Sequence, residues 1–118
     1  MNLVERADEV AARAYAPYSN YRVGAVVETR DGKRFEGVNV ENAAYPLGVC
    51  AEKSAIVAAV AAGYGPGDLV AIGINASPCG GCRQWLHEFK LERVSYRGND
   101  GAIRDATPAE LLPDGWEF

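Results

Sequence analysis

Two short cysteine motifs constrain this chain more than any other feature. They are Cys50-Ala51-Glu52 and Pro78-Cys79-Gly80-Gly81-Cys82. Each stands where helix-forming sequence begins, and Cys79 and Cys82, three residues apart, share one face of their helix. Glu52 follows Cys50 by only two residues, so both side chains can border one metal ion only if the ion lies beyond the helix end. The spacing therefore predicts that both motifs lie at helix starts.

Hydrophobic periodicity predicts the first part of the fold. Apolar residues recur at three- and four-residue spacing from Leu3 to Tyr15, which indicates an amphipathic helix that Pro17 ends. The turn sequence Asp31-Gly32 lies between two strand-forming runs and predicts a β-hairpin. The expected strands are Tyr21–Thr29 and Arg34–Val40. An irregular loop is expected to follow them.

Helices and strands alternate in the second part. Alanine-rich sequence predicts a helix over Cys50–Ala62, and the continuous apolar run Leu69–Asn75 predicts a buried strand. Ser77-Pro78 predicts the cap and first residue of a helix that runs to Phe89. A short strand over Arg93–Arg97 and a helical turn from Thr107 to Leu112 are expected last.

This order of elements is typical of an α/β protein. A hairpin is antiparallel, whereas strands joined by a helical crossover are parallel, so we expect a mixed sheet. The chain has 118 residues, of which 48% are hydrophobic. These values fit one packed domain over residues 1–118.

Charge and hydropathy exclude some partners. The formal charge is −4 without a basic cluster, which disfavours nucleic acid because phosphate binding requires Lys and Arg. The longest apolar stretch, Ala55–Ala62, is too short to span a membrane, and the N-terminus lacks the pattern of a signal peptide. We therefore expect a cytoplasmic protein with reduced cysteines that acts on a small neutral or cationic molecule.

Three protein ligands with an open fourth position are typical of a catalytic zinc site. Zinc on Cys50, Cys79 and Cys82 is expected to lower the pKa of a water in that position. Three thiolates oppose this effect, and the positive ends of two helices, together with Lys53, are expected to compensate for their charge. Glu52 is the only carboxylate beside a predicted ligand, and is therefore the expected proton shuttle.

Three other interpretations of the cysteines remain open. Cys79 and Cys82 have the spacing of a redox dithiol, but they come late in the chain and would leave Cys50 without a role. A structural zinc site usually has a fourth protein ligand, and His87, the only histidine, lies five residues past Cys82 and off its helix face. Simple burial of all three cysteines does not account for their arrangement in two motifs.

With these motifs, the sequence resembles the small homotetrameric cytidine deaminases, which are zinc enzymes. The similarity covers most of the chain in the same order. The matching segments are 15–19, 23–25, 39–43, 45–52, 77–84 and 111–113. The resemblance implies a three-layer α/β/α sandwich with a five-stranded sheet, one Zn²⁺ per subunit, and a homotetramer whose subunits share active sites.

The resemblance also implies roles for the matched residues. Asn39 and Glu41 are expected to hydrogen-bond the ribose hydroxyls, and the backbone of Ala51 to bind the pyrimidine carbonyl. The backbone near Ser77 and Cys79 is expected to contact the leaving amine. The other expected substrate contacts come from Tyr21 and, across a subunit boundary, from Ala43, Tyr45 and Trp116.

Three residues depart from the common family pattern. Tyr21 replaces a phenylalanine that packs against the base, and its hydroxyl requires a partner. Lys53 replaces an arginine beside the thiolates, which keeps the charge but loses the planar guanidinium. Trp116 replaces a phenylalanine that caps the neighbouring site.

The implied activity is hydrolytic deamination of cytidine and deoxycytidine to uridine and deoxyuridine, as in pyrimidine salvage. Deamination of another small aminated heterocycle, such as blasticidin S, would share the zinc chemistry, but Asn39 and Glu41 favour a nucleoside. A non-catalytic, zinc-stabilised binding module is an alternative of another class. An intact Glu52 beside an open metal position disfavours that alternative.

Overall fold

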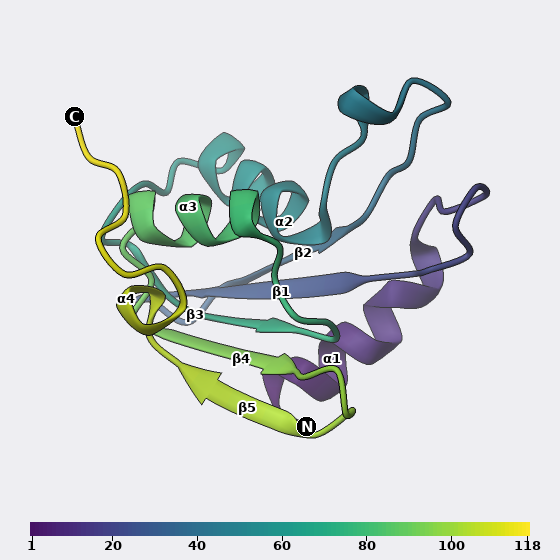
Figure 1. The fold of residues 1–118 in the computed structure, drawn as a ribbon. Helices are drawn as coiled ribbons and strands as arrows, with labels where there is room; N and C mark the ends of the chain where they lie inside the picture. The colour runs from purple at the N-terminus through teal and green to yellow at the C-terminus, as the bar shows by residue number, and fades with distance from the viewer.

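The computed structural model describes residues 1–118 and contains one five-stranded sheet (Figure 1). The strands are β1 (Gly24–Thr29), β2 (Arg34–Val38), β3 (Leu69–Ile74), β4 (Arg93–Arg97) and β5 (Ile103–Ala106). Their order across the sheet is β2-β1-β3-β4-β5. Only β3 and β4 pair in parallel, which confirms the expected mixed sheet with an antiparallel hairpin.

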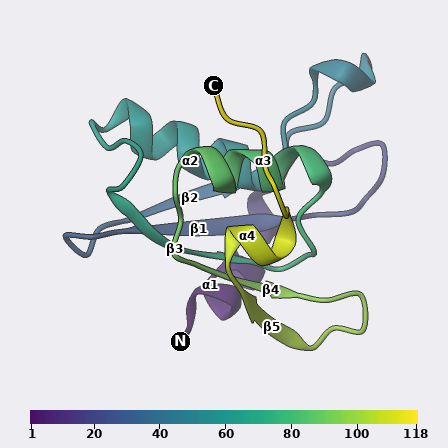
Figure 2. The ribbon, with the colours of Figure 1, turned by 60° about the vertical axis from the view of Figure 1, so that its left-hand side comes forward.

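Helices cover both faces of the sheet (Figure 2). The helices are α1 (Leu3–Val10), α2 (Ala51–Ala61), α3 (Gly80–Glu88) and α4 (Pro108–Leu111). In both views α1 lies on one face, whereas α2 and α3 lie side by side on the other. The three-layer α/β/α sandwich is therefore confirmed. None of the helices is long and apolar enough to cross a membrane.

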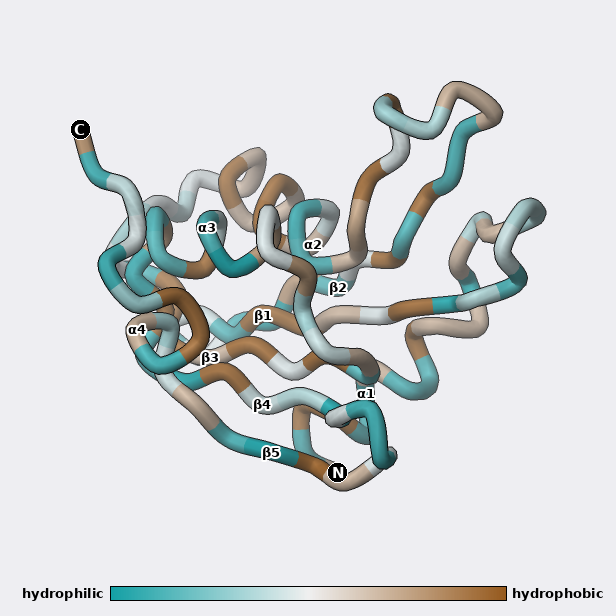
Figure 3. Tube along the Cα trace, in the orientation of Figure 1, coloured by the Kyte–Doolittle hydropathy of each residue, from teal (hydrophilic) through white to brown (hydrophobic).

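Alternating side chains of β1 build both interfaces of the sheet. Ala25 and Val27 belong to the main core, which also contains Ile56 of α2 and Leu86 of α3. Val26 points to the other face and packs with residues of α1. Apolar residues lie along β1, β3 and α2, whereas the outer strand β5 is mostly hydrophilic (Figure 3).

A glycine on β2 lets α2 lie directly on the sheet. A Cβ atom at Gly37 would lie 2.2 Å from the backbone nitrogen of Ala55 and 2.6 Å from the backbone oxygen of Ala51. No side chain fits between these backbones, so glycine is required by the close approach. Because Ala51 is the first residue of α2, this contact also fixes where Cys50 lies.

The ends of several predicted elements were wrong. The first helix stops at Val10 and tightens into a 3₁₀ turn over Ala11–Arg13, since Ala14 is already extended and Tyr15 pairs with Val40. The strands of the hairpin are shorter than predicted and span residues 24–29 and 34–38.

Two further differences lie in the second part of the chain. Strand β5 was missing from the pattern-based prediction because its four residues, Ile103–Ala106, lie at the sheet edge and are largely exposed. The third helix is capped by Cys79 and not by Ser77, because the Cys79 sulfur accepts a hydrogen bond from the Cys82 amide at 3.4 Å.

Candidate active site

The two cysteine motifs converge in space. Cys50 is the N-cap of α2, and Cys79 is the N-cap of α3. The Sγ atoms of Cys50 and Cys79 lie 3.9 Å apart, and these two sulfurs and that of Cys82 lie within 4.8 Å of one another. Tetrahedral zinc with Zn–S bonds of about 2.3 Å separates its sulfur ligands by about 3.8 Å. The three cysteines therefore fit a zinc ion.

His87 lies elsewhere, as expected from its helical position. Its Nε2 atom contacts a carboxylate oxygen of Glu117 at 3.0 Å, and the imidazole is not part of the metal-binding cluster. The cluster consequently offers three possible protein ligands, the number typical of a catalytic zinc site, and not four.

The electrostatics of the cluster favour thiolate at Cys50. A hydrogen bond with Cys82 is the main factor that lowers the pKa of Cys50 to about 6, and Cys79 and the charge of Lys53 act in the same direction against burial. The same hydrogen bond and burial raise the pKa of Cys82. Metal binding must displace the remaining thiol protons, so zinc affinity falls as the pH falls.

Glu52 lies in the first turn of α2, next to the sulfurs, and its side chain is only 4% exposed. Burial raises the pKa of Glu52, and the charge of Cys50 adds to this effect. Its own backbone amide, Cys82 and Lys53 act in the opposite direction. A raised pKa makes the carboxyl group a better proton acceptor, as a group that takes up and releases protons requires.

Glu52 borders a cavity of about 220 Å³ that opens beside the sulfurs. The cavity is lined by Cys50, Ala51, Glu52 and Cys79, together with Tyr21, Val23, Asn39, Ala76 and Ser77. The structure thus brings the predicted acid, two of the predicted ligands and four predicted substrate contacts to one cavity.

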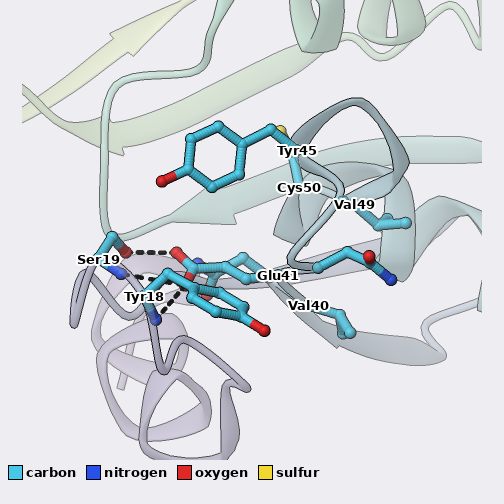
Figure 4. Close-up of a pocket in the computed structure, with 10 residues that line it drawn as sticks. Tyr18, Ser19, Val40, Glu41, Tyr45, Val49 and Cys50 are labelled. Atoms are coloured by element: carbon cyan, nitrogen blue, oxygen red, sulfur yellow. Dashed lines mark hydrogen bonds between the residues drawn. The ribbon is translucent and has the colours of Figure 1, made fainter.

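A second cavity of about 480 Å³ shares Asn39 and Cys50 with the first. Glu41 and Tyr45 line it, and Tyr18 and Ser19 face the Glu41 carboxylate (Figure 4). Asn39 and Glu41 already make internal hydrogen bonds. Asn39 accepts from the Val23 amide at 2.8 Å and donates to the Tyr21 carbonyl at 2.9 Å.

The remaining predicted residues differ in how they lie relative to the cysteine cluster and the two cavities. Lys53 places its Nζ atom 6.0 Å from the centroid of the Trp85 ring, and its charge acts on Cys50. Ala43 is exposed and borders neither cavity. Trp116 lies on the C-terminal tail, is 64% exposed and borders neither of these cavities.

Two side chains near the site had no predicted role. Ser19 donates its hydroxyl proton to the Glu41 carboxylate. Arg83 donates to the carbonyl oxygens of Pro78 and Leu111, at 2.9 and 3.0 Å, and so fastens the start of α3 to α4. Both lie inside the segments that carry the family resemblance, which was the only available signal for them.

Zinc deaminases combine a metal held by protein side chains with a glutamate that moves protons and is not itself a ligand. The fold and the arrangement of Glu52 beside the three sulfurs define this class.

Comparison with known proteins identifies the family. A sequence model of the cytidine and deoxycytidylate deaminase zinc-binding region matches residues 1–97. A cytidine deaminase of Halalkalibacterium halodurans is 40% identical over 119 residues, which cover 94% of this chain and 89% of the relative. A probable cytidine deaminase of Dictyostelium discoideum is 43% identical, with coverage of 93% and 78%.

Solved structures give the same result. A 1.6 Å crystal structure of cytidine deaminase from Burkholderia pseudomallei has a TM-score of 0.89 and 43% identity, covering 97% of this chain and 96% of that one. Cytidine deaminase from Mycobacterium tuberculosis has a TM-score of 0.83 and 34% identity, with coverage of 98% and 95%. The chain therefore belongs to the cytidine and deoxycytidylate deaminase family, a zinc-binding family.

Proposed function

We propose that this chain deaminates cytidine and deoxycytidine hydrolytically, giving uridine or deoxyuridine and ammonia, as in pyrimidine salvage. The observation that carries this proposal is the buried Glu52 beside three convergent sulfurs, at the wall of a cavity of about 220 Å³. Pockets for drug-sized ligands measure about 300–1,000 Å³, so this smaller cavity suits a single base ring. The relatives named above as cytidine deaminases support the choice of base.

Cys50, Cys79 and Cys82 are the proposed zinc ligands, and Lys53 the residue that offsets their charge. When bound, zinc activates a water molecule for attack on the amine-bearing carbon of the ring. Glu52 takes a proton from that water on its carboxylate and delivers it to the adjacent ring nitrogen. It then takes the second proton of the attacking oxygen and delivers it to the amine, so that ammonia leaves as the ring carbonyl forms. Its burial excludes bulk water, which would otherwise compete for these protons.

The other cavity residues hold the substrate in this proposal. The backbone of Ala51 binds the pyrimidine carbonyl, the backbone near Ser77 and Cys79 contacts the amine, and Tyr21 packs against the base. Asn39 and Glu41 bind the ribose hydroxyls. A carboxylate offers about four acceptor positions. Internal bonds use three of those of Glu41, so one remains for a sugar hydroxyl.

A homotetramer with shared sites completes the proposal. Tyr45 and Leu47, in the 3₁₀ turn of the loop before α2, are 79% and 69% exposed, which is unusual for large apolar side chains. Burial against a neighbouring subunit would remove this area from water. Ala43, Tyr45 and Trp116 then reach the site of a neighbour, which accounts for the distance of Ala43 and Trp116 from the cavity in their own chain.

The proposed location is the cytoplasm, because thiolate ligands persist in a reducing compartment. We also propose that residues 1–118 act as one domain, since residues from the first strand to the fourth contribute to the main core.

The test is incubation of the zinc-loaded protein with cytidine, followed by chromatography for uridine and an assay for ammonia. The proposal predicts equal amounts of both products, and similar conversion of deoxycytidine. Blasticidin S and cytosine in parallel reactions test whether the sugar is recognised. A zinc-loaded, folded protein that converts none of the nucleosides would contradict the proposal.

A further inference from the structure

The Ser19 hydroxyl links two parts of the site that the sequence motifs treat separately. It donates its proton to the Glu41 carboxylate and accepts a hydrogen bond from the Tyr21 amide at 3.0 Å. A serine hydroxyl has one donor and two acceptor positions. Ser19 therefore uses its single proton on Glu41 while it holds the backbone of Tyr21.

Glu41 binds the same turn through two more donors. The amides of Tyr18 and Ser19 both donate to its Oε1 atom, at 2.9 and 3.1 Å (Figure 4). Together with the Ser19 hydroxyl, these donors lower the pKa of Glu41 and so favour its charged form. Hydrogen bonds to a carboxylate are roughly twice as strong as neutral ones. The turn is thus bound to Glu41 at three points.

The backbone between Ser19 and Tyr21 is set for this contact. Asn20 has a φ of 58°, in the left-handed region that asparagine tolerates better than most residues. This conformation turns the Tyr21 amide back towards the Ser19 hydroxyl, a local side chain–backbone bond typical of serine. Asn39 holds Tyr21 on its other side. The Asn39 side-chain amide donates a hydrogen bond to the Tyr21 carbonyl, and its oxygen accepts one from the Val23 amide.

We propose that Ser19 is a positioning residue that couples the Glu41 carboxylate to the backbone of Tyr21. This inference rests on the proposed function, in which Glu41 binds the ribose and Tyr21 packs against the base. Ser19 acts through Glu41 and Tyr21, which are the residues proposed to contact the substrate. It sets the spacing between the sugar contact and the aromatic wall of the cavity, so that one nucleoside fits both.

The coupling should affect substrate binding more than the chemical step. Glu41 and Tyr21 hold the base and sugar equally in the ground state and the transition state, whereas the proton transfers belong to Glu52, which makes no hydrogen bond to this turn. Removal of such uniform binding raises KM and leaves kcat nearly unchanged. Loss of one hydrogen bond to a charged group is expected to raise KM for cytidine about tenfold.

A double-mutant cycle tests the coupling. We expect Ser19→Ala to raise KM about tenfold. Ser19→Thr should keep KM near the wild-type value, because the hydroxyl is kept and the site is exposed. In a Glu41→Gln background, Ser19→Ala should have little further effect on KM. Ser95→Ala is the matched control. Ser95 also donates to a carboxylate, that of Asp105, but it lies on β4 at the other side of the sheet.

Amide hydrogen exchange measured by NMR provides a readout that does not depend on activity. Ser19→Ala should speed exchange of the Tyr21 amide by tenfold or more, and Ser95→Ala should leave it unchanged. If the wild type fails to deaminate cytidine, the proposed function fails, and the exchange cycle still decides this inference. Additive effects of Ser19→Ala and Glu41→Gln, or unchanged exchange at Tyr21, would overturn it.

Discussion

The sulfurs of Cys50 and Cys79 lie 3.9 Å apart, although 29 positions separate the two residues in the sequence. Each residue caps a different helix, so the distance is set by how α2 and α3 lie on the sheet. Both helices direct their positive ends at the sulfurs. A metal ion bound there holds the two helix starts together, which links metal binding to folding.

Replacement of Cys50 by alanine tests this link. Cys50→Ala should lose most of its zinc, because two sulfurs remain where a catalytic site has three protein ligands. Saturation at 100 times Kd stabilises a protein by about 2.7 kcal/mol, so the free energy of unfolding should fall by about this amount. Zinc analysis and urea unfolding measure both effects. A wild-type zinc content would refute Cys50 as a ligand.

Contact between β2 and α2 provides a prediction about stability. Gly37→Ala would place a Cβ atom 2.2 Å from the backbone nitrogen of Ala55, so α2 must shift. Overpacking of this kind costs about 1–3 kcal/mol, which thermal or urea unfolding detects. Gly65→Ala is the control, because a Cβ there has no neighbour closer than 3.9 Å. Equal stability of the two variants would contradict the close packing of α2 on β2.

An ion pair between α1 and β2 makes stability depend on pH. Arg6, at 2.6 Å, and Arg13, at 2.5 Å, lower the pKa of Glu36. A lowered folded-state pKa means that this stabilisation is complete above the ordinary carboxyl pKa, near 4.3, and is lost as the pH falls through the folded-state value.

Glu36→Gln should therefore reduce the free energy of unfolding by about 1 kcal/mol at neutral pH. The difference from wild type should shrink as the pH is lowered below the ordinary carboxyl range. Glu9→Gln, which alters only a more exposed contact of Arg6, should have a smaller effect. Urea unfolding at several pH values measures the differences, and a gap that widens on acidification would be inconsistent with this pair.

Shared active sites predict that two defective variants can complement each other. Glu52→Gln lacks the proposed acid and Tyr45→Ala lacks the proposed contact across the subunit boundary. If the chain is a tetramer with shared sites, a mixed tetramer can form a site with both residues intact. Random assortment should restore about one quarter of the wild-type activity. A mixture of Glu52→Gln with Cys79→Ser is the control, because both defects affect residues of one chain's own site. If the first mixture recovers no activity, Tyr45 does not contribute to the active site of a neighbouring subunit.

Local sequence signals predicted most elements and the convergence of Cys50, Cys79 and Cys82. The spacing of Cys79 and Cys82 depends only on the helical repeat, so it could be interpreted without the tertiary structure. The edge strand β5 could not be predicted in this way, because Arg104 and Asp105 leave its short sequence without an alternating apolar pattern. Strand β5 forms because β4 offers backbone hydrogen-bonding groups to pair with, and not because its own sequence has a strand pattern.

The internal contacts of the substrate residues were also beyond the sequence. Asn39 and Glu41 were predicted from the resemblance as ribose contacts, but their bonds to residues 18–23 depend on how the loop before β1 folds back. The hydroxyl of Ser19 has no sequence signature of its own. Such roles arise from contacts between segments about 20 residues apart, and only the folded chain reveals them.

Glu52→Gln tests whether a zinc site of three cysteines works with Glu52 as its proton carrier. Uridine formation and bound zinc should be measured on the same sample of this variant and on wild type. If Glu52 carries the proton, the variant should bind as much zinc as wild type, and its turnover should fall about 10²–10⁴-fold, the usual contribution of a general acid–base group. Turnover close to that of wild type, with zinc fully bound, would contradict the role of Glu52.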